Sequence, residues 1–254
     1  MRLTANNYYS QEANQAYFSA SQIKSFRDCQ ARTMAEIRGE WERQPSSALL
    51  IGSYVDSYFE GTLDEFINKH PECFKRDGTL KSEYVNANEM IRKAESDPVF
   101  VEYTQGEKQR IFTGDLFGCG FKAKFDFYLP GKRICDLKTC KDLSAVYREG
   151  EGRVSFVEAY GYTLQMAIYK TLEGNDLPCY LACITKQSPP DLCVIEIPYE
   201  VMDTELMLLK KELPLYDAIK RGAVEAERCE KCEYCRATKK LTGPTSFYDI
   251  EGGM

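Results

Sequence analysis

The sequence has no long hydrophobic run. Its uninterrupted apolar stretches extend over only a few residues, whereas a membrane-spanning helix needs roughly 20. The first residues, Met1 to Ala5, also lack the apolar core of a secretion signal. We therefore expect a cytoplasmic protein that does not enter a membrane. Repeats and low-complexity linkers are absent as well, and 254 residues with a 43% apolar fraction can fill a substantial core.

Positively charged residues are fewer than negatively charged ones. The 33 lysines and arginines are outnumbered by 39 acidic residues, which gives a net charge of −6, and His70 is the only histidine. A generic nucleic-acid coat protein draws its affinity from a broad basic surface, so this class is disfavoured, although a local basic groove is compatible with the totals. An acidic balance also suits an enzyme that gathers carboxylates around divalent cations.

A disulfide framework is not expected either, because a reducing cytosol keeps thiols free. The eleven cysteines are then available for packing, metal binding or chemistry. Cys229, Cys232 and Cys235 are each separated by two residues, and three ligands at that spacing can converge on one zinc ion or iron–sulfur cluster if a fourth ligand joins them. Ordinary reduced thiols in a polar tail are the alternative.

Hydrophobic periodicity predicts an α/β fold. A capping-box pattern at Ser19 and Gln22 starts the first of several segments with helical spacing. We expect helices at about 19–40, 47–59, 155–172 and 199–220, and strands within 110–141 and at 179–186 and 193–198. The order predicts one domain over 1–254, with a mainly helical part at 19–102, a core at 103–200, and a helix and cysteine-rich tail at 201–254.

Two predicted strands inside 110–141 bring acidic residues together. Asp126 lies in the first strand, and a Pro-Gly-Lys turn at 130–132 leads to the second, where Asp136 and Lys138 share a face. Phosphodiester hydrolysis by a divalent metal needs carboxylates that hold the ion and a positive group that orients the water and stabilises developing charge. These three side chains are therefore our candidate catalytic residues.

The register of this hairpin decides whether the two carboxylates meet. If residues 130–132 form a three-residue loop, Leu129 pairs with Arg133 and Asp126 falls opposite Asp136. The acid-x-Lys spacing alone is weak, because 39 acidic residues and 19 lysines predict about three matches by chance, and one occurs. An exposed strand ion pair of little energetic value is the alternative interpretation.

Further candidates lie at helical and strand spacing. Gln165 and Tyr169, four apart in a predicted helix, would share a face suited to contacting a phosphate backbone, although a buried amphipathic helix explains them nearly as well. Asp56 lies one helical turn after Gly52 and is a candidate ligand. Glu107, on the polar lead-in to the strands, is either another ligand or a solvated loop residue.

Together these motifs resemble the PD-(D/E)xK nuclease superfamily, particularly its RecB-like branch and the phage exonucleases related to RecE and lambda exonuclease. The resemblance spans most of the chain and is carried by Ser19 to Cys29, Gly52 to Asp56, Lys124 to Asp126, Asp136 to Lys138 and Gln165 to Tyr169. It implies a restriction-endonuclease-like core, in which helices flank a central mixed β-sheet, with helical insertions and the cysteine-rich tail added.

The resemblance also implies roles for individual residues. Asp126 and Asp136 would bind Mg²⁺ or Mn²⁺, the carbonyl of Leu137 would complete the shell, and Lys138 would position or activate the attacking water. Many RecB-like members carry histidine where this chain has Asp56, and an oxygen ligand at that position still suits a hard cation.

Other residues would hold DNA or a second metal centre. By the resemblance, Gln165 and Tyr169 would support DNA. Lys122 and Lys124, on the strand face of Asp126, are either phosphate contacts or ordinary solvated residues. Several RecB-like nucleases have an iron–sulfur staple built from one early and three late cysteines, and Cys29 occupies the early position. A [4Fe–4S] cluster is thus implied, with Zn²⁺ as its rival.

We therefore expect a Mg²⁺- or Mn²⁺-dependent deoxyribonuclease, in particular an exonuclease that serves phage-type recombination or DNA end processing. DNA is the expected substrate, and a single-strand annealing recombinase and further copies of the chain are candidate partners. One alternative is a non-catalytic DNA-binding or recombination accessory protein that retains the nuclease fold. Another is a zinc-stabilised protein-interaction domain.

Overall fold

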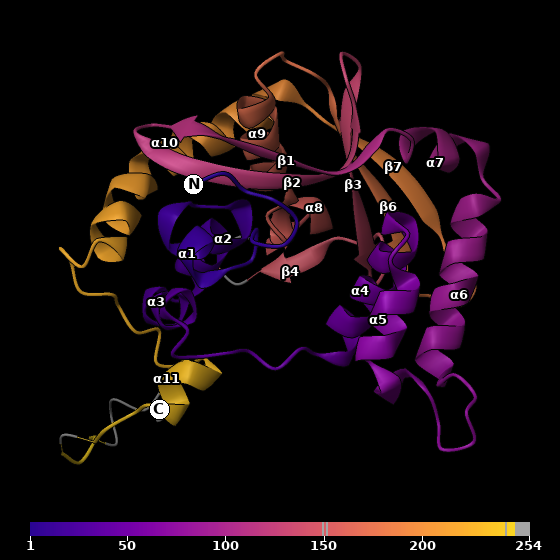
Figure 1. The fold of residues 1–254 in the computed structure, drawn as a ribbon. Coiled ribbons are helices and arrows are strands. Elements are labelled where there is room, and N and C mark those ends of the chain that lie inside the picture. The colour runs from indigo at the N-terminus through magenta and orange to yellow at the C-terminus, as the bar shows by residue number, and fades with distance from the viewer. Residues whose placement is uncertain (149, 151, 242, 247–254) are drawn as a thin grey trace.

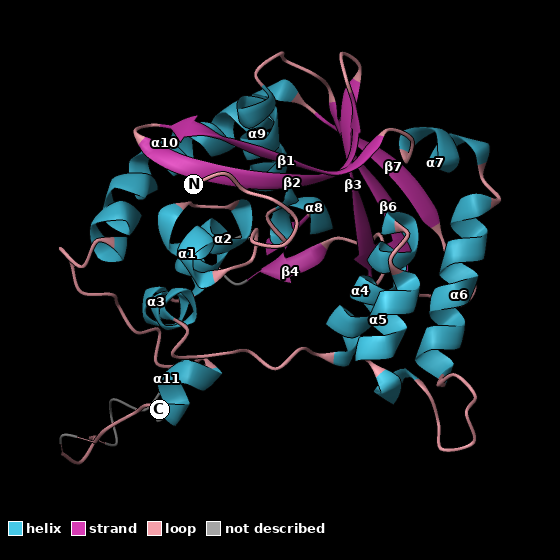
Figure 2. Cartoon of the chain, in the orientation of Figure 1, coloured by secondary structure: helices cyan, strands magenta, loops and turns pink. Residues whose placement is uncertain are grey.

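A mixed five-stranded sheet with helices on both faces forms the centre of the molecule (Figures 1 and 2). The computed structural model describes residues 1–148, 150, 152–241 and 243–246. The sheet has the order β1-β2-β3-β6-β7, and only β3 and β6 among these neighbours run parallel. The described strands are β1 (Glu107–Leu116), β2 (Cys119–Leu129), β3 (Arg133–Cys140), β6 (Cys179–Thr185) and β7 (Leu192–Ile197), with β4 (Val146–Arg148) and β5 (Gly152–Val154) in a separate pair.

The helices cover the sheet from two sides. In the described ranges they are α1 (Gln11–Ala16), α2 (Ala20–Asp28), α3 (Gln30–Arg38), α4 (Ser47–Glu60), α5 (Leu63–Lys69), the 3₁₀ turn η1 (Pro71–Cys73), α6 (Ser82–Glu95), α7 (Pro98–Tyr103), α8 (Phe156–Ala159), α9 (Tyr162–Glu173), α10 (Tyr199–Lys220) and α11 (Glu233–Ala237). Met166 of α9 packs with Phe125 and Leu181 on one face, and Val55 of α4 packs with Leu137 on the other. The predicted sheet flanked by helices is confirmed. No helix in the described part of the chain is long and apolar enough to span a membrane.

Two predicted helices are interrupted. The helix expected over 19–40 breaks at Cys29, whose extended backbone (φ −165°) ends α2 and begins α3. The helix expected over 155–172 breaks at Gly161, which has a left-handed backbone (φ +63°) and precedes α9. A Cβ atom at Gly161 would lie 2.8 Å from Lys24 Cδ. Both breaks depend on tertiary contacts that helical periodicity does not encode.

Helix α4 lies close to strand β3 because of one glycine. The side chain of Ser46 caps the start of α4 by accepting the N–H of Leu49. A Cβ atom at Gly52 would lie 3.0 Å from Thr139 Oγ1 of β3, so a larger side chain at this position would push the helix away. This close approach brings Asp56, one turn further along α4, to the strand that carries Asp136 and Lys138.

Strands β2 and β3 separate soon after their hairpin. Their pairs are Leu129–Arg133, Tyr128–Ile134 and Phe127–Cys135, so the predicted three-residue loop and its register are confirmed. Within the described strands, the pairing stops one position before Asp126 and Asp136, which the register predicted to be opposite. Beyond that point Phe18 lies beside β2, where its N–H donates to the Gly120 carbonyl and its carbonyl accepts from the Lys122 N–H, both at 2.8 Å.

Candidate active site

Asp126 lies where strand β2 changes the direction of its side chains. In a regular strand Phe125 and Phe127 would point to the same face. Phe125 instead packs with α9 and Phe127 with α4 and α6. On the neighbouring strand β1, Gln109 has φ +55°, an uncommon conformation for a residue other than glycine. The backbone irregularity at these two positions frees Asp126 from ordinary strand pairing and directs it toward β3.

Two donors hold the Asp126 carboxylate. Gln109 Nε2 donates to Oδ1 at 3.1 Å, and the backbone N–H of Leu137 donates to Oδ2 at 3.0 Å. Burial raises the pKa of Asp126 well above its usual range, the charge of Asp136 raises it further, and Lys138 opposes both effects. Removal from water and a neighbouring like charge both disfavour the carboxylate form, so a cation bound here would be strongly stabilising.

Asp136 and Lys138 form a buried ion pair on β3. Asp136 is 1% exposed. Its Oδ1 accepts from Gln165 Nε2 at 2.7 Å, and its Oδ2 contacts the Lys138 ammonium. Burial disfavours the charged form of Lys138, but Asp136 and Asp126 outweigh burial and raise the pKa of Lys138. The ammonium also lies 4.9 Å from the ring centroid of Tyr162. Lys138 is thus held as a charged donor beside both carboxylates.

A chain of hydrogen bonds from α9 bridges the two diverging strands. Gln165 Nε2 donates both to Asp136 of β3 and, at 3.0 Å, to the hydroxyl of Tyr169. The Tyr169 hydroxyl in turn donates to the carbonyl of Lys124 in β2 at 3.0 Å. Gln165 and Tyr169 are each only 8% exposed. Both side chains orient a carboxylate and bridge two strands, and both line the same cavity as the carboxylates, so their contact with DNA stays a prediction.

Asp56 joins the acidic group from the opposite side. Burial raises its pKa to about 7, Lys138 lowers it, and Asp136 raises it. Between α2, α4 and the diverging strands lies a cavity of about 240 Å³. Its lining includes Asp56, Gln109, Lys124, Asp126, Asp136 and Lys138. The fold thus brings Asp56 and Lys138, which are distant in the sequence, to one cavity.

Two predicted site residues are engaged by neighbouring groups. Glu107 is exposed at the start of β1, where its carboxylate is 3.6 Å from the guanidinium of Arg110, and it does not line the cavity as described. It forms a surface ion pair there, and its role as a metal ligand stays a prediction. Lys122 is 2% exposed, and its ammonium donates to Asn14 Oδ1 at 2.7 Å and to the carbonyl of Tyr8. Its ammonium is thus engaged by the N-terminal segment, although the residue also lines the carboxylate cavity, and its contact with a phosphate stays a prediction.

Several cavity residues were not predicted from the sequence. Glu60 lines the cavity one turn after Asp56, and the spacing of four would have indicated it. Gln109 gave no signal, because its position depends on an irregular backbone. Lys24 of α2 and Tyr9 also line the cavity. Burial and the charge of Lys138 lower the pKa of Lys24 to about 8, and Tyr9 is 69% exposed.

The donor set suits a hard divalent cation. Asp56, Asp126 and Asp136 bring three carboxylates to one cavity, and Lys138, which contacts Asp136, supplies a positive charge there. Mg²⁺ and Mn²⁺ prefer such all-oxygen sites. The N–H and C=O of a strand residue point to the same side, so the carbonyl of Leu137 faces β2 together with the N–H that binds Asp126. The residues therefore fit the ion that the sequence resemblance implies.

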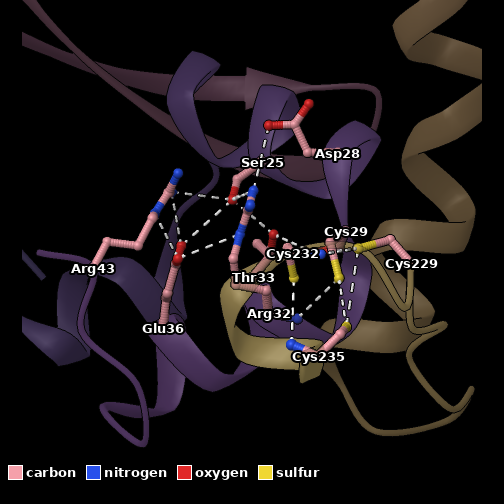
Figure 3. A network of polar contacts seen from close by, with 10 residues as sticks. All are labelled: Ser25, Asp28, Cys29, Arg32, Thr33, Glu36, Arg43, Cys229, Cys232 and Cys235. Carbon is pink, nitrogen blue, oxygen red and sulfur yellow. Dashed lines mark hydrogen bonds and ion pairs between the residues drawn. The ribbon is translucent and has the colours of Figure 1, made fainter. Parts of the chain in front are cut away.

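Four cysteines gather at a second site, between the α2–α3 junction and the C-terminal tail (Figure 3). Their sulfur atoms all lie within 4.8 Å of one another, and Cys29 joins Cys229, Cys232 and Cys235 as predicted. All eleven cysteines are free of disulfides. This group can hold a metal, and it lies apart from the carboxylate cavity.

The fold and the carboxylate cavity define a PD-(D/E)xK arrangement, with one acidic residue on β2 and an acid-x-Lys pair on β3. The family described as a PDDEXK-like domain of unknown function matches residues 19–238. The chain belongs to this family, and the resemblance expected from its motifs is confirmed.

Comparison with solved structures agrees with this assignment. The crystal structure of a protein described as a "Putative exonuclease" from Eubacterium rectale is 40% identical, is covered over 100% of both chains, and has a TM-score of 0.96. A structure described as SSO0001 is 13% identical over 75% of this chain and 86% of that chain, with a TM-score of 0.29. A search of curated proteins gave no significant match. Family and structure together support a nuclease.

Proposed function

We propose that this protein is a Mg²⁺- or Mn²⁺-dependent deoxyribonuclease that hydrolyses phosphodiester bonds at the carboxylate cavity. One observation carries the proposal: Asp126 and Asp136 come from two strands that part at this point, and both face the Lys138 ammonium in a buried acidic cavity. Burying like charges is costly. An oxygen-ligated cation and a phosphate are the species that would use this arrangement.

The carboxylates and Lys138 would have different roles in hydrolysis. Asp126 and Asp136 would hold the ion, with Asp56 and the carbonyl of Leu137 as further ligands, and the ion would supply Lewis-acid polarisation of the scissile phosphate. Lys138, kept protonated by its carboxylate neighbours, would donate to the attacking water or to a phosphate oxygen. It would thereby stabilise the negative charge that develops in the transition state.

The mouth of the cavity suits a nucleic-acid strand. Lys124 is partly exposed, and its ammonium lies 5.0 Å from the ring centroid of Tyr9. Tyr9 itself is mostly exposed, and an exposed aromatic ring offers a stacking surface to a base of any identity. Lys124 would meet the phosphate backbone beside it. Lys124 and Tyr9 are more exposed than Lys122, Gln165 and Tyr169, so they are the first DNA contacts that we propose.

Exonucleolytic cleavage is the proposed form of this activity. The 40% identical protein is described as a "Putative exonuclease", and the sequence motifs resemble those of phage exonucleases. End resection leaves single strands, which are the substrate of a single-strand annealing recombinase. We therefore also propose a role in phage-type recombination or DNA end processing, with such a recombinase and further copies of the chain as candidate partners.

End-labelled linear DNA and covalently closed circular DNA test the function directly. With Mg²⁺ or Mn²⁺ we expect the linear substrate to be degraded and the circle to resist. The Asp126→Asn variant should cleave at least about 100-fold more slowly, because it removes a ligand charge from the ion. Cleavage of the circle would identify an endonuclease instead. DNA binding by the wild type without cleavage of either substrate would identify a non-catalytic accessory protein.

Gln165→Ala is expected to lower the rate of cleavage by about 10- to 100-fold, the usual effect of losing a group that orients a metal ligand. The substitution removes the donor that fixes Asp136 Oδ1, so the apparent affinity for Mn²⁺ should fall with it. Cleavage measured against Mn²⁺ concentration checks both effects.

Gln105→Ala is the matched control for this variant, because Gln105 is exposed and its amide donates to the carbonyl of Val101. It should leave cleavage unchanged. An unaltered Mn²⁺ dependence in Gln165→Ala would mean that Gln165 serves packing alone.

A further inference from the structure

The four-cysteine site is compact. The sulfur atoms of Cys29 and Cys235 are 3.6 Å apart, those of Cys229 and Cys235 are 4.0 Å apart, and no pair among the four exceeds 4.8 Å. Figure 3 shows the four thiols converging from the α2–α3 junction and the tail. These separations can be compared with those that each candidate metal centre requires.

A single tetrahedral ion matches them. Zinc–sulfur bonds of about 2.3 Å in tetrahedral geometry place the four sulfur atoms about 3.8 Å apart. A [4Fe–4S] cluster binds each thiolate through a different iron, with the whole iron–sulfide cage between them, and so holds its ligand sulfurs much further apart. We propose that Cys29, Cys229, Cys232 and Cys235 bind one zinc-class ion, and that the cluster implied by resemblance to RecB-like nucleases does not fit this chain.

The surrounding backbone supports a site for thiolates. The N–H of Arg32 donates to Cys29 Sγ at 3.5 Å, that of Cys232 to Cys229 Sγ at 3.3 Å, and that of Cys235 to Cys232 Sγ at 3.5 Å. Such donors stabilise negative charge on sulfur and fix the direction of each ligand. Cys29 is also the N-cap residue of α3, so the dipole of this helix adds to the stabilisation.

The ion would fasten the tail to the wall of the carboxylate cavity. Cys29 follows the last residue of α2, and Ser19 and Lys24, at the start and middle of this helix, line the cavity. A helix of this length is about 14 Å long. The side chain of Arg32 is paired with Asp28 at 3.3 Å and Glu36 at 3.5 Å (Figure 3), which ties the two helices together at the junction. The ion therefore has a structural role at a distance from the reaction.

Metal analysis of the intact chain decides between the two centres. Protein from cells supplied with both iron and zinc, purified without oxygen, should contain about one zinc per chain and neither iron nor acid-labile sulfide. Replacement by Co²⁺ should give the visible absorption bands of a tetrahedral thiolate complex. About four irons and matching sulfide per chain, or a visible chromophore that bleaches on reduction, would overturn the proposal, as would four reactive thiols with no metal.

The Cys232→Ser variant tests the ligand set without removing a buried core residue, because Cys232 is partly exposed. Its zinc affinity, measured by competition with a chromophoric chelator, should fall at least about tenfold. The matched control is Cys193→Ser on β7, which is also partly exposed and should bind zinc like the wild type. Equal zinc affinity in Cys232→Ser and the wild type would contradict the proposed ligand set, whatever the nuclease assay gives.

Discussion

Replacing Lys138 by alanine is expected to slow metal-dependent cleavage of linear DNA by about 100- to 1,000-fold, the range seen when one donor to a developing negative charge is removed. The ammonium of Lys138 contacts Asp136 and lies beside Asp126 in the cavity. Its loss removes the protonated donor of the site and leaves the neighbouring carboxylates without their neutralising partner. Initial rates with a labelled duplex in saturating Mn²⁺ measure the effect.

Two controls separate chemistry from binding and folding. Lys132→Ala alters an exposed lysine in the β2–β3 turn and should cleave at the wild-type rate. DNA binding by Lys138→Ala, followed by fluorescence anisotropy in Ca²⁺, should stay within about threefold of the wild type, because the proposed effect acts on the transition state. Full cleavage activity in Lys138→Ala would show that the reaction takes place somewhere else.

Phe125→Ala is expected to destabilise the protein by about 3–5 kcal/mol. The Phe125 side chain is fully buried in β2, and its ring lies 4.4 Å from that of Phe112 and 4.5 Å from that of Tyr169, between ring centroids. Truncation leaves a cavity between the sheet and α9 that its neighbours cannot fill completely. Urea unfolding followed by circular dichroism measures the change in the free energy of unfolding.

The same substitution at an exposed position provides the comparison. Phe117 is 45% exposed in the β1–β2 turn, and Phe117→Ala should cost less than about 1 kcal/mol. If the two variants unfold at the same urea concentration, the core around Phe125 is not packed as described. Tyr169 rests on the Phe125 ring, so Phe125→Ala should also loosen the hydrogen-bond chain through which α9 orients Asp136.

The local sequence pattern was enough to predict the β2–β3 hairpin and its register. The Pro-Gly-Lys loop placed Leu129 opposite Arg133, as found, because loop length fixes hairpin register. The same pattern overestimated how far the pairing continues. In the described chain it ends at Phe127 and Cys135. Beyond this point Phe18 lies beside β2, a contact between distant segments that periodicity cannot reveal.

Side-chain direction at the site could be predicted only in part from the sequence. Lys122 was placed by strand alternation on the face of Asp126, but the face changes near Asp126 and the N-terminal segment covers Lys122. Gln109 could not be predicted because its importance depends on a backbone angle. The three late cysteines, by contrast, were predictable as a group from their close spacing, and Cys29 was added to them by the resemblance to RecB-like nucleases.

The parallel pairing of β3 with β6 imposes an order on folding. Strands β2 and β3 meet through a three-residue loop, whereas β3 can meet β6 only after the segment 141–178 has crossed over, and such distant pairings form more slowly than local ones. Gln165 lies within that crossover. A nascent chain that has emerged only as far as β3 therefore already contains Asp56, Asp126 and Asp136, but it lacks the amide that orients Asp136. Synthesis of the chain thus delivers the acidic residues first and the group that aligns them later.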